Sequence, residues 1–270
     1  MLNLLVFNWN YNSYLVDFLD SVSCLKNSSK VRVFFVDDGS TDESIETLKN
    51  HIIDKDISNF HLSLSGTENL GRKYPAFGQL EGLKRVLNSQ VIDSEDFIWF
   101  MDVDDAFDFS NLDIIYDELE RGNDVTFLNL HDKNLMDGSI KEYPISRKID
   151  EARNKEIWPS ISPTSSIIIK ARFIDSWHKI LFDFSSDFSE LWLDARVNIL
   201  AQKYCKVSYS DIVVYRNIHG GNDSLNIGFF RALNKQLQAC SFFDRYTPSD
   251  VYSPRLQFLR FVNAFFKKFV

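Results

Sequence analysis

VRVFFVDDGSTDES, residues 31–44, joins an apolar run to two aspartates, a glycine and the start of an amphipathic stretch. An apolar run of this length without polar alternation is typical of a strand buried on both faces. Ser40 and Glu43 have the spacing of a capping box, which predicts that a helix begins directly after the strand. The segment therefore predicts a β-strand, a carboxylate-bearing turn and an α-helix.

The same order recurs on both sides of this segment. Apolar runs at 2–7, 60–65 and 96–101 predict further strands, and amphipathic stretches at 14–25, 44–53 and 76–87 predict helices. Apolar strands that alternate with helices indicate a Rossmann-like, mostly parallel sheet flanked by helices. The fold class is therefore α/β.

The second half of the chain is less regular. Strands are expected at 126–130, 165–170, 206–210 and 212–216, and helices at 188–203 and from 228 onward. The pattern changes from strand to helix after Asn222. We therefore predict a domain at 1–222, with halves at 1–105 and 106–222, and a C-terminal helical extension at 223–270.

The composition narrows the class of protein. The 270 residues include 44% hydrophobic residues, enough for one large domain. The 30 basic and 38 acidic residues give a net charge of −8, which disfavours nucleic acid as a partner. The three cysteines are widely spaced and predict a reducing cytoplasm. We expect no secretory signal and no membrane-spanning segment, because the N-terminus lacks a basic leader and no apolar run is long enough.

Carboxylates gather directly after two of the predicted strands. Asp102, Asp104 and Asp105 follow one, and Asp37 and Asp38 follow another. In open α/β sheets, ligands bind beyond the carboxyl ends of the strands. Crowded carboxylates repel each other, and their oxygens suit Mg²⁺ or Mn²⁺ shared with substrate phosphates. A solvated acidic turn is the alternative.

Two further loops carry groups that suit a nucleotide. A carboxylate at Asp37 or Asp38 could accept hydrogen bonds from a base N–H or a ribose hydroxyl. The segment NLGRK, residues 69–73, follows the third strand. Its glycine permits a tight turn, and Arg72 or Lys73 could reach a diphosphate.

Together these segments resemble the family 2 glycosyltransferases of the GT-A fold. The resemblance rests on VFNWNYNSYLVDFLDSV (6–22), VFFVDDGSTDES (33–44), NLGRKYPA (69–76), FIWFMDVDDAF (97–107) and LWLDARVNILAQKYCKVSYSDIVVYRNIHGGN (191–222). The motifs occur in the family's order and spacing, and they cover residues 1–222. The fold that the resemblance implies is GT-A.

The resemblance also implies roles for residues on the donor side. Asp38 would contact the nucleotide base, with Asn10 nearby. Asp102 and Asp104 would lie along the ribose and diphosphate, with Arg72 and Lys73 approaching the diphosphate. Asp104 or Asp105 would hold a divalent cation, Mn²⁺ or Mg²⁺, and His219 falls where some members place an additional metal or diphosphate contact.

On the acceptor side, Asp194 falls where the family places its catalytic base. Glu190 is the reserve, because residues four apart share a helix face. The sequence departs from the family's pattern at two places. Leu193 replaces the acidic residue that commonly precedes the base, and Pro75-Ala76-Phe77 replaces the frequent A-R-N. Trp158 is a candidate for shaping the acceptor pocket, with a core tryptophan as the alternative.

The function implied is metal-dependent, inverting transfer of a sugar from a nucleotide-diphosphate sugar, with UDP-sugars favoured, to a hydroxyl of a glycan or lipid-linked acceptor. Bacterial capsule, O-antigen or other surface glycan synthesis is the expected setting. A catalytically impaired nucleotide-sugar-binding module of the same fold stays open as the alternative.

Residues 255–270 mix aromatic and basic side chains, which predicts peripheral contact with the inner face of the plasma membrane. A helix docked on the core is the other reading of that segment.

Overall fold

The structure is a computed structural model that describes residues 1–26, 28–55, 59–65, 73–143, 162–219, 228–247 and 254–266. Arg72, Trp158 and the glycines after His219, all singled out in the sequence, lie outside these ranges. Among the described residues, no helix is both long enough and apolar enough to cross a membrane.

The first half of the chain forms a parallel sheet. Its strands are β1 (Leu2–Asn8), β2 (Val31–Asp37), β3 (Phe60–Leu64) and β4 (Phe97–Asp102). They pair in the order β3-β2-β1-β4, all parallel. Asn8 lies opposite Asp37, and Phe7 lies opposite Asp102. The carboxyl ends of β2, β1 and β4 therefore meet at one edge of the sheet, as the sequence predicts.

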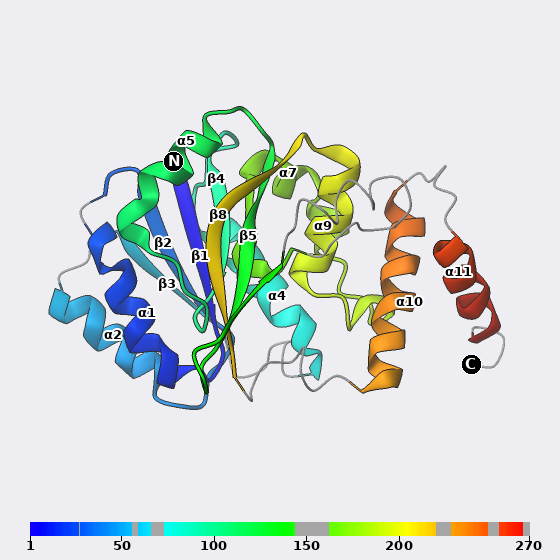
Figure 1. Cartoon of the computed structure of the whole chain (residues 1–270), viewed down its shortest axis with the longest axis horizontal. Coiled ribbons are helices and arrows are strands. Elements are labelled where there is room, and N and C mark those ends of the chain that lie inside the picture. The colour runs from blue at the N-terminus through cyan, green and yellow to red at the C-terminus, as the bar shows by residue number, and fades with distance from the viewer. Residues whose placement is uncertain are drawn as a thin grey trace.

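The second half extends this sheet with antiparallel pairs. β7 (Ile167–Lys170) pairs antiparallel with both β4 and β5 (Val125–Asn134), and β6 (Ile140–Tyr143) pairs antiparallel with β5. β8 (Val207–Ile218) runs parallel to β5 over its whole length. The result is one mixed, eight-stranded sheet (Figure 1).

β8 corrects one prediction from the sequence. Separate strands were expected at 206–210 and 212–216, but the structure has one continuous strand. Leu128 lies opposite Ser210 whereas Asn129 lies opposite Val213, so β8 bulges between the two halves. The bulge takes up the extra residues without ending the strand.

Helices cover both faces of the sheet. On one face lie α1 (Asn12–Val22), α2 (Ser44–Lys55) and α5 (Leu112–Leu119), which pack on alternate strand residues such as Leu4 and Val6. On the other face lie α4 (Gly78–Ser89), α7 (Ala171–Ser176), α8 (His178–Leu181) and α9 (Leu193–Tyr204), which pack on Leu5 and Phe7. The alternation along β1 explains why its sequence is apolar throughout.

The predicted C-terminal helices form a pair on this second face. α10 (Phe229–Tyr246) and α11 (Pro254–Phe266) are antiparallel neighbours at the far side of the molecule from α2 (Figure 1). Phe242 and Phe243 of α10, with Leu256 and Leu259 of α11, belong to the same hydrophobic core as α4 and α9. The extension therefore adds to the core of the domain.

The helix expected at 188–203 begins later, at Leu193, because of one buried arginine. Arg196 is completely buried and donates hydrogen bonds to backbone carbonyls of the preceding segment. The acceptors are the carbonyls of Leu181, Asp183, Phe188 and Leu191, at 2.8 to 3.1 Å. These carbonyls are turned toward the guanidinium, so the chain between α8 and α9 follows a compact loop with a 3₁₀ turn at Ser186–Phe188.

Candidate functional site

The candidate site lies at the carboxyl end of β4, where the chain turns sharply. The amide of Asp105 donates to the carbonyl of Asp102, at 3.0 Å, which closes the turn. Val103 is buried and belongs to the core on the α1 side of the sheet. Asp104 and Asp105 are also buried, and Asp102 is partly buried. The turn thus holds three carboxylates in a small, poorly solvated space.

Each of these carboxylates has partners from other parts of the chain. Gln79 of α4 donates to Asp102, at 2.8 Å. His219, directly after β8, lies with its Nε2 2.9 Å from Oδ2 of Asp104. The backbone amide of Asn217 donates to the side chain of Asp105, at 3.3 Å. The side-chain amide of Asn217 donates to the backbone carbonyl of Asp104, at 2.6 Å. β8 and α4 therefore complete the turn that β4 begins.

The electrostatics of the turn favour a cation. Burial raises the pKa of Asp102, and the charges of Asp105, Asp104 and Asp194 raise it further. Burial also raises the pKa of Asp105, with a further contribution from Asp104. For Asp104 burial raises the pKa more than the contact with His219 lowers it. Buried like charges of this kind are stabilised when a metal ion or a positively charged group lies among them.

The residues predicted as metal ligands are only partly brought together. Asp104 and His219 are in contact, whereas Asp105 is hydrogen-bonded to Asn217 and to the side chain of Ser165. Within the described part of the chain, no three His, Cys, Asp or Glu side chains form a group that could hold a metal ion. Mg²⁺ and Mn²⁺ commonly take only one or two protein ligands, with phosphate oxygens and water supplying the others. The Asp104–His219 pair suits such a site.

Asp194 lies in the first turn of α9. Its negative charge contributes to the raised pKa of Asp102. Burial raises the pKa of Asp194 itself, partly offset by its bond from the Ala195 amide and by Lys235. The Asn198 side chain donates to the carbonyl of Asp194, at 2.8 Å, and also bonds Ser162. Asp194 is therefore held by α9 and by the segment that leads into β7.

Glu190, the reserve candidate, is engaged differently. Its carboxylate accepts a hydrogen bond from Nε of Arg231, at 2.8 Å, and the pair is partly exposed. Its amide donates to the side chain of Gln238. Glu190 thus ties the loop before α9 to α10, and its charge is balanced by Arg231.

Asp37 and Asp38 have separate surroundings at the end of β2. Asp37 is buried and accepts hydrogen bonds from the side chains of Asn8 and Ser40 and from the amides of Gly39 and Ser40. These bonds, 2.5 to 2.9 Å long, occupy both carboxylate oxygens. Asp37 therefore holds the shape of the loop after β2.

Asp38 lies against the start of α4. A Cβ built on Gly78 would lie 2.0 Å from Oδ2 of Asp38, so only glycine permits this approach. A Cβ on Gly82, one turn on, would lie 2.2 Å from Cγ1 of Val36. Arg85 of the same helix donates to the carbonyl of Asp37, at 3.1 Å. Gly78 thus lets the Asp38 carboxylate approach α4, while Gly82 and Arg85 hold the same helix against the end of β2.

Asn10 connects the loops that follow β1 and β2. Its backbone is left-handed, with φ of 58°, which asparagine tolerates better than most residues. Its side-chain oxygen accepts from the amide of Thr41, at 2.7 Å, and its own amide donates to Ser40. The two predicted donor-side loops are therefore joined. Lys73 is exposed, with its ammonium 5.0 Å from the ring centroid of Tyr74.

Some residues of the site were not predicted from the sequence. Gln79 and Asn217 bond the acidic turn directly, and both stand beside motifs already singled out, in the first turn of the expected helix 76–87 and in YRNIH. Tyr14 stacks on His219 with ring centroids 4.7 Å apart, and Tyr11 packs edge-on against both rings. Burial and the charges of Asp104, Asp102 and Asp105 raise the pKa of Tyr11. Aromatic residues in a helix start give no signal of this kind in the sequence.

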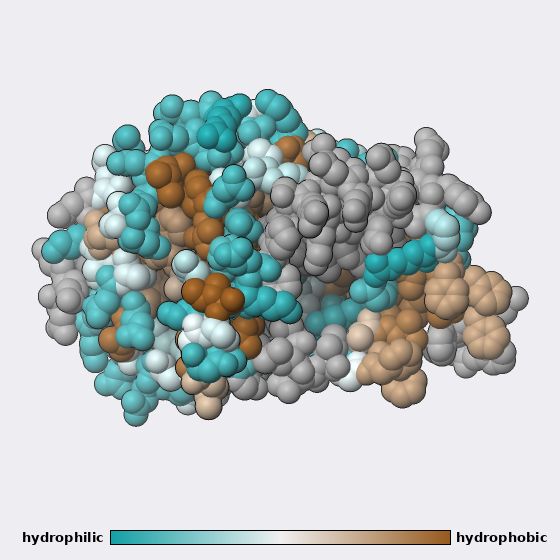
Figure 2. Space-filling view, viewed as in Figure 1, coloured by the Kyte–Doolittle hydropathy of each residue, from teal (hydrophilic) through white to brown (hydrophobic). Residues whose placement is uncertain are grey.

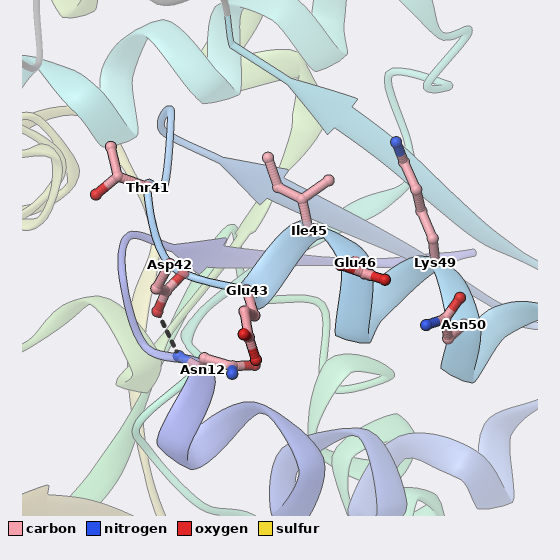
Figure 3. A pocket seen from close by; sticks show the side chains of 8 residues that line it. All are labelled: Asn12, Thr41, Asp42, Glu43, Ile45, Glu46, Lys49 and Asn50. Carbon is pink, nitrogen blue, oxygen red and sulfur yellow. Dashed lines mark hydrogen bonds between the residues drawn. The ribbon is translucent and has the colours of Figure 1, made fainter.

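A hollow of about 730 Å³ lies beside the site, between the start of α1 and the first turns of α2 (Figure 3). Asp42, Glu43 and Glu46 line it together with Lys49, and Asp42 accepts from the amide of Asn12, at 3.0 Å. It contains none of the predicted site residues. The acidic turn, where residues of β4, α4 and β8 meet, is therefore the better candidate site.

Comparisons with known proteins place the fold. No family model matches the chain, and no curated protein matches its sequence. Among solved structures, S. aureus TarS 1–349 in complex with UDP is similar with a TM-score of 0.60 and 16% identity, over 97% of this chain and 87% of that one. The mannosyltransferase PcManGT from Pyrobaculum calidifontis, in complex with GDP-Man and Mn²⁺, is similar with a TM-score of 0.59 and 14% identity, over 97% and 68%.

These similarities extend over nearly the whole of this chain. At such low sequence identity they establish the architecture. The mixed sheet flanked by helices is the GT-A fold of glycosyltransferases. The fold predicted from the sequence is confirmed.

Proposed function

We propose that this protein is a metal-dependent, inverting glycosyltransferase that moves a sugar from a nucleotide-diphosphate sugar to an acceptor hydroxyl. The observation that carries the proposal is the acidic turn Asp102–Asp105, which the GT-A fold holds at the carboxyl ends of its strands and where the charge of Asp194 on α9 contributes to the raised pKa of Asp102. TarS structures contain UDP or UDP-GlcNAc, and PcManGT contains GDP-Man with Mn²⁺. These neighbours support a nucleotide-sugar donor and a divalent cation.

The donor's diphosphate would lie over the acidic turn. Asp104 and His219 are the residues that would hold Mn²⁺ or Mg²⁺, and their oxygen and nitrogen donors suit these ions. When bound, the ion supplies positive charge where negative charge develops on the departing diphosphate. Asp102 keeps its orientation through Gln79, and Asp105 keeps the turn attached to β8 through Asn217. Arg72 and Lys73, in the segment before α4, are proposed as additional diphosphate contacts.

The nucleoside would lie between the loops after β1 and β2. Asp38 is proposed to accept a hydrogen bond from the base, since Gly78 and α4 hold its carboxylate at this edge. Asn10 joins the two loops through Thr41 and Ser40 and would set their separation. Asp37 contributes indirectly, because its oxygens are used within the loop.

Asp194 is proposed as the catalytic base. The acceptor oxygen attacks the anomeric carbon while its proton passes to the Asp194 carboxylate, and the bond from the anomeric carbon to the diphosphate oxygen breaks. Attack opposite the leaving group inverts the anomeric centre. The raised pKa of Asp194 makes it a better proton acceptor than an exposed aspartate. Glu190 is less suited to this role, because Arg231 balances its charge.

The acceptor is proposed to be a glycan or a lipid-linked sugar, and the setting bacterial surface glycan synthesis at the cytoplasmic face of the membrane. The alternative is a nucleotide-sugar-binding module of the same fold that has lost turnover. Leu193, in place of an acidic residue beside Asp194, and Phe77 leave room for that alternative.

A thermal-shift panel tests the proposal. UDP, GDP, dTDP and CMP are each added with and without Mn²⁺; a nucleotide at about one hundred times its dissociation constant stabilises the folded state by about 2.7 kcal/mol. We expect one nucleotide, with UDP favoured, to stabilise the protein only with Mn²⁺, and Asp104→Ala to remove the effect. No shift with any nucleotide would contradict the proposal. If a nucleotide stabilises the protein but no nucleoside diphosphate is released from the matching donor sugar, the protein is the binding module that has lost turnover.

A further inference from the structure

The helix pair α10–α11 carries an aromatic surface that the core does not use. It consists of Phe229, Phe230, Phe258, Phe261 and Phe265, each between 53% and 83% exposed. The first two are in the first turn of α10 and the others are on α11. Figure 2 shows apolar residues gathered at the α10–α11 end of the molecule. We call these five residues the phenylalanine surface.

α11 is apolar on two opposite sides, and among the described residues only one of these sides belongs to the hydrophobic core. Leu256 and Leu259 are buried, and Asn263 on the same side donates to Ser241 of α10, at 2.7 Å. Phe258, Phe261 and Phe265, spaced by three and four residues, form the opposite stripe. A helix that has already docked on its neighbour through leucines gains nothing from a second apolar stripe in water. The exposed stripe therefore indicates a partner outside this chain.

The charge of the region indicates the nature of that partner. Residues 228–270 contain seven Lys or Arg, two Asp and no Glu, although the whole chain has a net charge of −8. Within α10 and α11 as described, the one acidic residue is Asp244, and Arg260 binds it with bonds as short as 2.6 Å. Arg231 and Arg245 also pair with acidic residues outside the two helices, Glu190 and Asp187, so the positive charge of the segment is partly balanced. The aromatic residues thus lie in a segment whose own side chains carry a net positive charge in a negatively charged protein.

We infer that the phenylalanine surface docks on an anionic lipid bilayer. Aromatic and basic side chains on one helical surface are the combination that enters the interface of such a membrane. A second copy of this chain fits less well, because it would bring two positive regions together. Both Phe229 and Phe230 lie outside the segment 255–270 that suggested membrane contact, so the surface spans two helices and is larger than the terminal segment alone.

The orientation of the surface fits the proposed acceptor. The first turn of α10 and the last turn of α11 lie toward the same side of the molecule as the carboxyl ends of β1 and β4 (Figure 1). Phe229, Phe230 and Phe265 lie at these ends, and docking through them brings the site edge of the sheet toward the lipid surface. This consequence for a lipid-linked acceptor depends on the proposed function, whereas the docking itself does not.

Vesicle flotation tests the inference without any donor or acceptor. The full chain is mixed with vesicles of phosphatidylcholine alone, or of phosphatidylcholine with phosphatidylglycerol, and floated through a density gradient. We expect the protein to float with the anionic vesicles and to be released by salt, since the electrostatic attraction is screened. Failure to float with anionic vesicles, or equal flotation with neutral ones, would overturn the inference.

Paired variants test whether the phenylalanine surface, and not any exposed apolar side chain, binds the vesicles. Phe258→Ser/Phe261→Ser and, separately, Phe229→Ser/Phe230→Ser are expected to weaken vesicle binding by about tenfold or more. Val91→Ser/Met136→Ser is the control, because these side chains are 88% and 91% exposed elsewhere on the molecule. Circular dichroism confirms that each variant is folded. Equal binding by the phenylalanine variants and the wild type would overturn the inference.

The oligomeric state tests whether a second copy of this chain, instead of a membrane, covers the phenylalanine surface. Sedimentation equilibrium of the wild type without lipid is expected to give a monomer. A dimer that the phenylalanine variants dissociate, together with no flotation of the wild type, would assign the surface to self-association instead. Nucleotide-dependent thermal shifts of the same variants are expected to equal those of the wild type, so failure of the docking is distinguishable from failure of the donor site.

Discussion

Nε2 of His219 lies 2.9 Å from Oδ2 of Asp104, although the two residues are 115 positions apart in the sequence. Tyr14 stacks on the imidazole and keeps the ring in place. The pair combines two kinds of side chain that bind Mn²⁺, at the end of β4 where the diphosphate is proposed to lie.

The first prediction concerns this pair. His219→Ala is expected to raise the Mn²⁺ concentration needed for nucleotide-dependent stabilisation by about tenfold or more, since a ligand and its neighbours together set metal affinity. Thermal shift at increasing Mn²⁺ measures the effect. Asp108→Asn is the control, because Asp108 follows the same strand but caps a separate 3₁₀ turn. If His219→Ala needs the same Mn²⁺ concentration as the wild type, His219 is not part of the metal site.

The second prediction separates the two base candidates. Asp194→Asn is expected to lower the rate of sugar transfer by about 10²- to 10⁴-fold while nucleotide binding is kept, because only the proton acceptor is lost. Glu190→Gln removes a carboxylate from the partly exposed pair with Arg231 and is expected to change stability by less than about 1 kcal/mol. Release of nucleoside diphosphate measures the rate. A larger loss in Glu190→Gln than in Asp194→Asn would reverse the assignment.

The third prediction uses the two close glycines of α4. Gly82→Ala should cost about 1–3 kcal/mol of folding free energy, because a methyl group would overlap the stiff side chain of Val36. Gly78→Ala should cost less, because the Asp38 carboxylate that it would overlap can turn away. Urea unfolding measures this cost. Only Gly78→Ala is expected to weaken nucleotide binding as well, since only its neighbour is a proposed base contact. Equal nucleotide affinity in both variants would show that the position of Asp38 does not matter for the donor.

The fourth prediction concerns pH and the attachment of α10. Burial disfavours ionised Asp183, but the Tyr246 hydroxyl, 2.5 Å away, together with Ser185 and Arg196, outweighs it and lowers the pKa of Asp183. A carboxylate with a lowered folded pKa stabilises the protein above its unfolded pKa of 3.8, and this stabilisation is lost as the pH falls through the lower folded value.

Tyr246→Phe removes the hydroxyl donor and keeps the ring. Its unfolding midpoint is expected to fall less steeply than that of the wild type between about pH 5 and pH 2.5. Without the hydroxyl, the pKa of Asp183 differs less between the folded and the unfolded state. Urea unfolding at fixed temperature across this range measures both proteins. Parallel pH curves would mean that the hydroxyl does not control the ionisation of Asp183.

The sequence predicts the parallel part of the sheet well, because β1, β2 and β4 are buried on both faces and are apolar throughout. It predicts Asp102, Asp104 and Asp105 as candidate site residues, because acidic side chains directly after an apolar run can be recognised in the sequence. Asp194 becomes a candidate only through the resemblance to the family 2 glycosyltransferases. It misses the late start of α9, since only the fold shows that Arg196 binds the carbonyls before it. It also misses Gln79 and Tyr11, whose roles depend on long-range packing against the acidic turn.

β8 has a consequence for the biosynthesis of the protein. The strand pairs with β5 along its whole length and brings Asn217 and His219 to a turn made more than a hundred residues earlier. Contacts so distant in sequence form late, because a long loop must close before they are made. While the chain is still on the ribosome, the first four strands can pair, but the aspartates at the end of β4 lack their partners. Binding of the proposed donor therefore requires that the chain has been synthesised at least as far as His219.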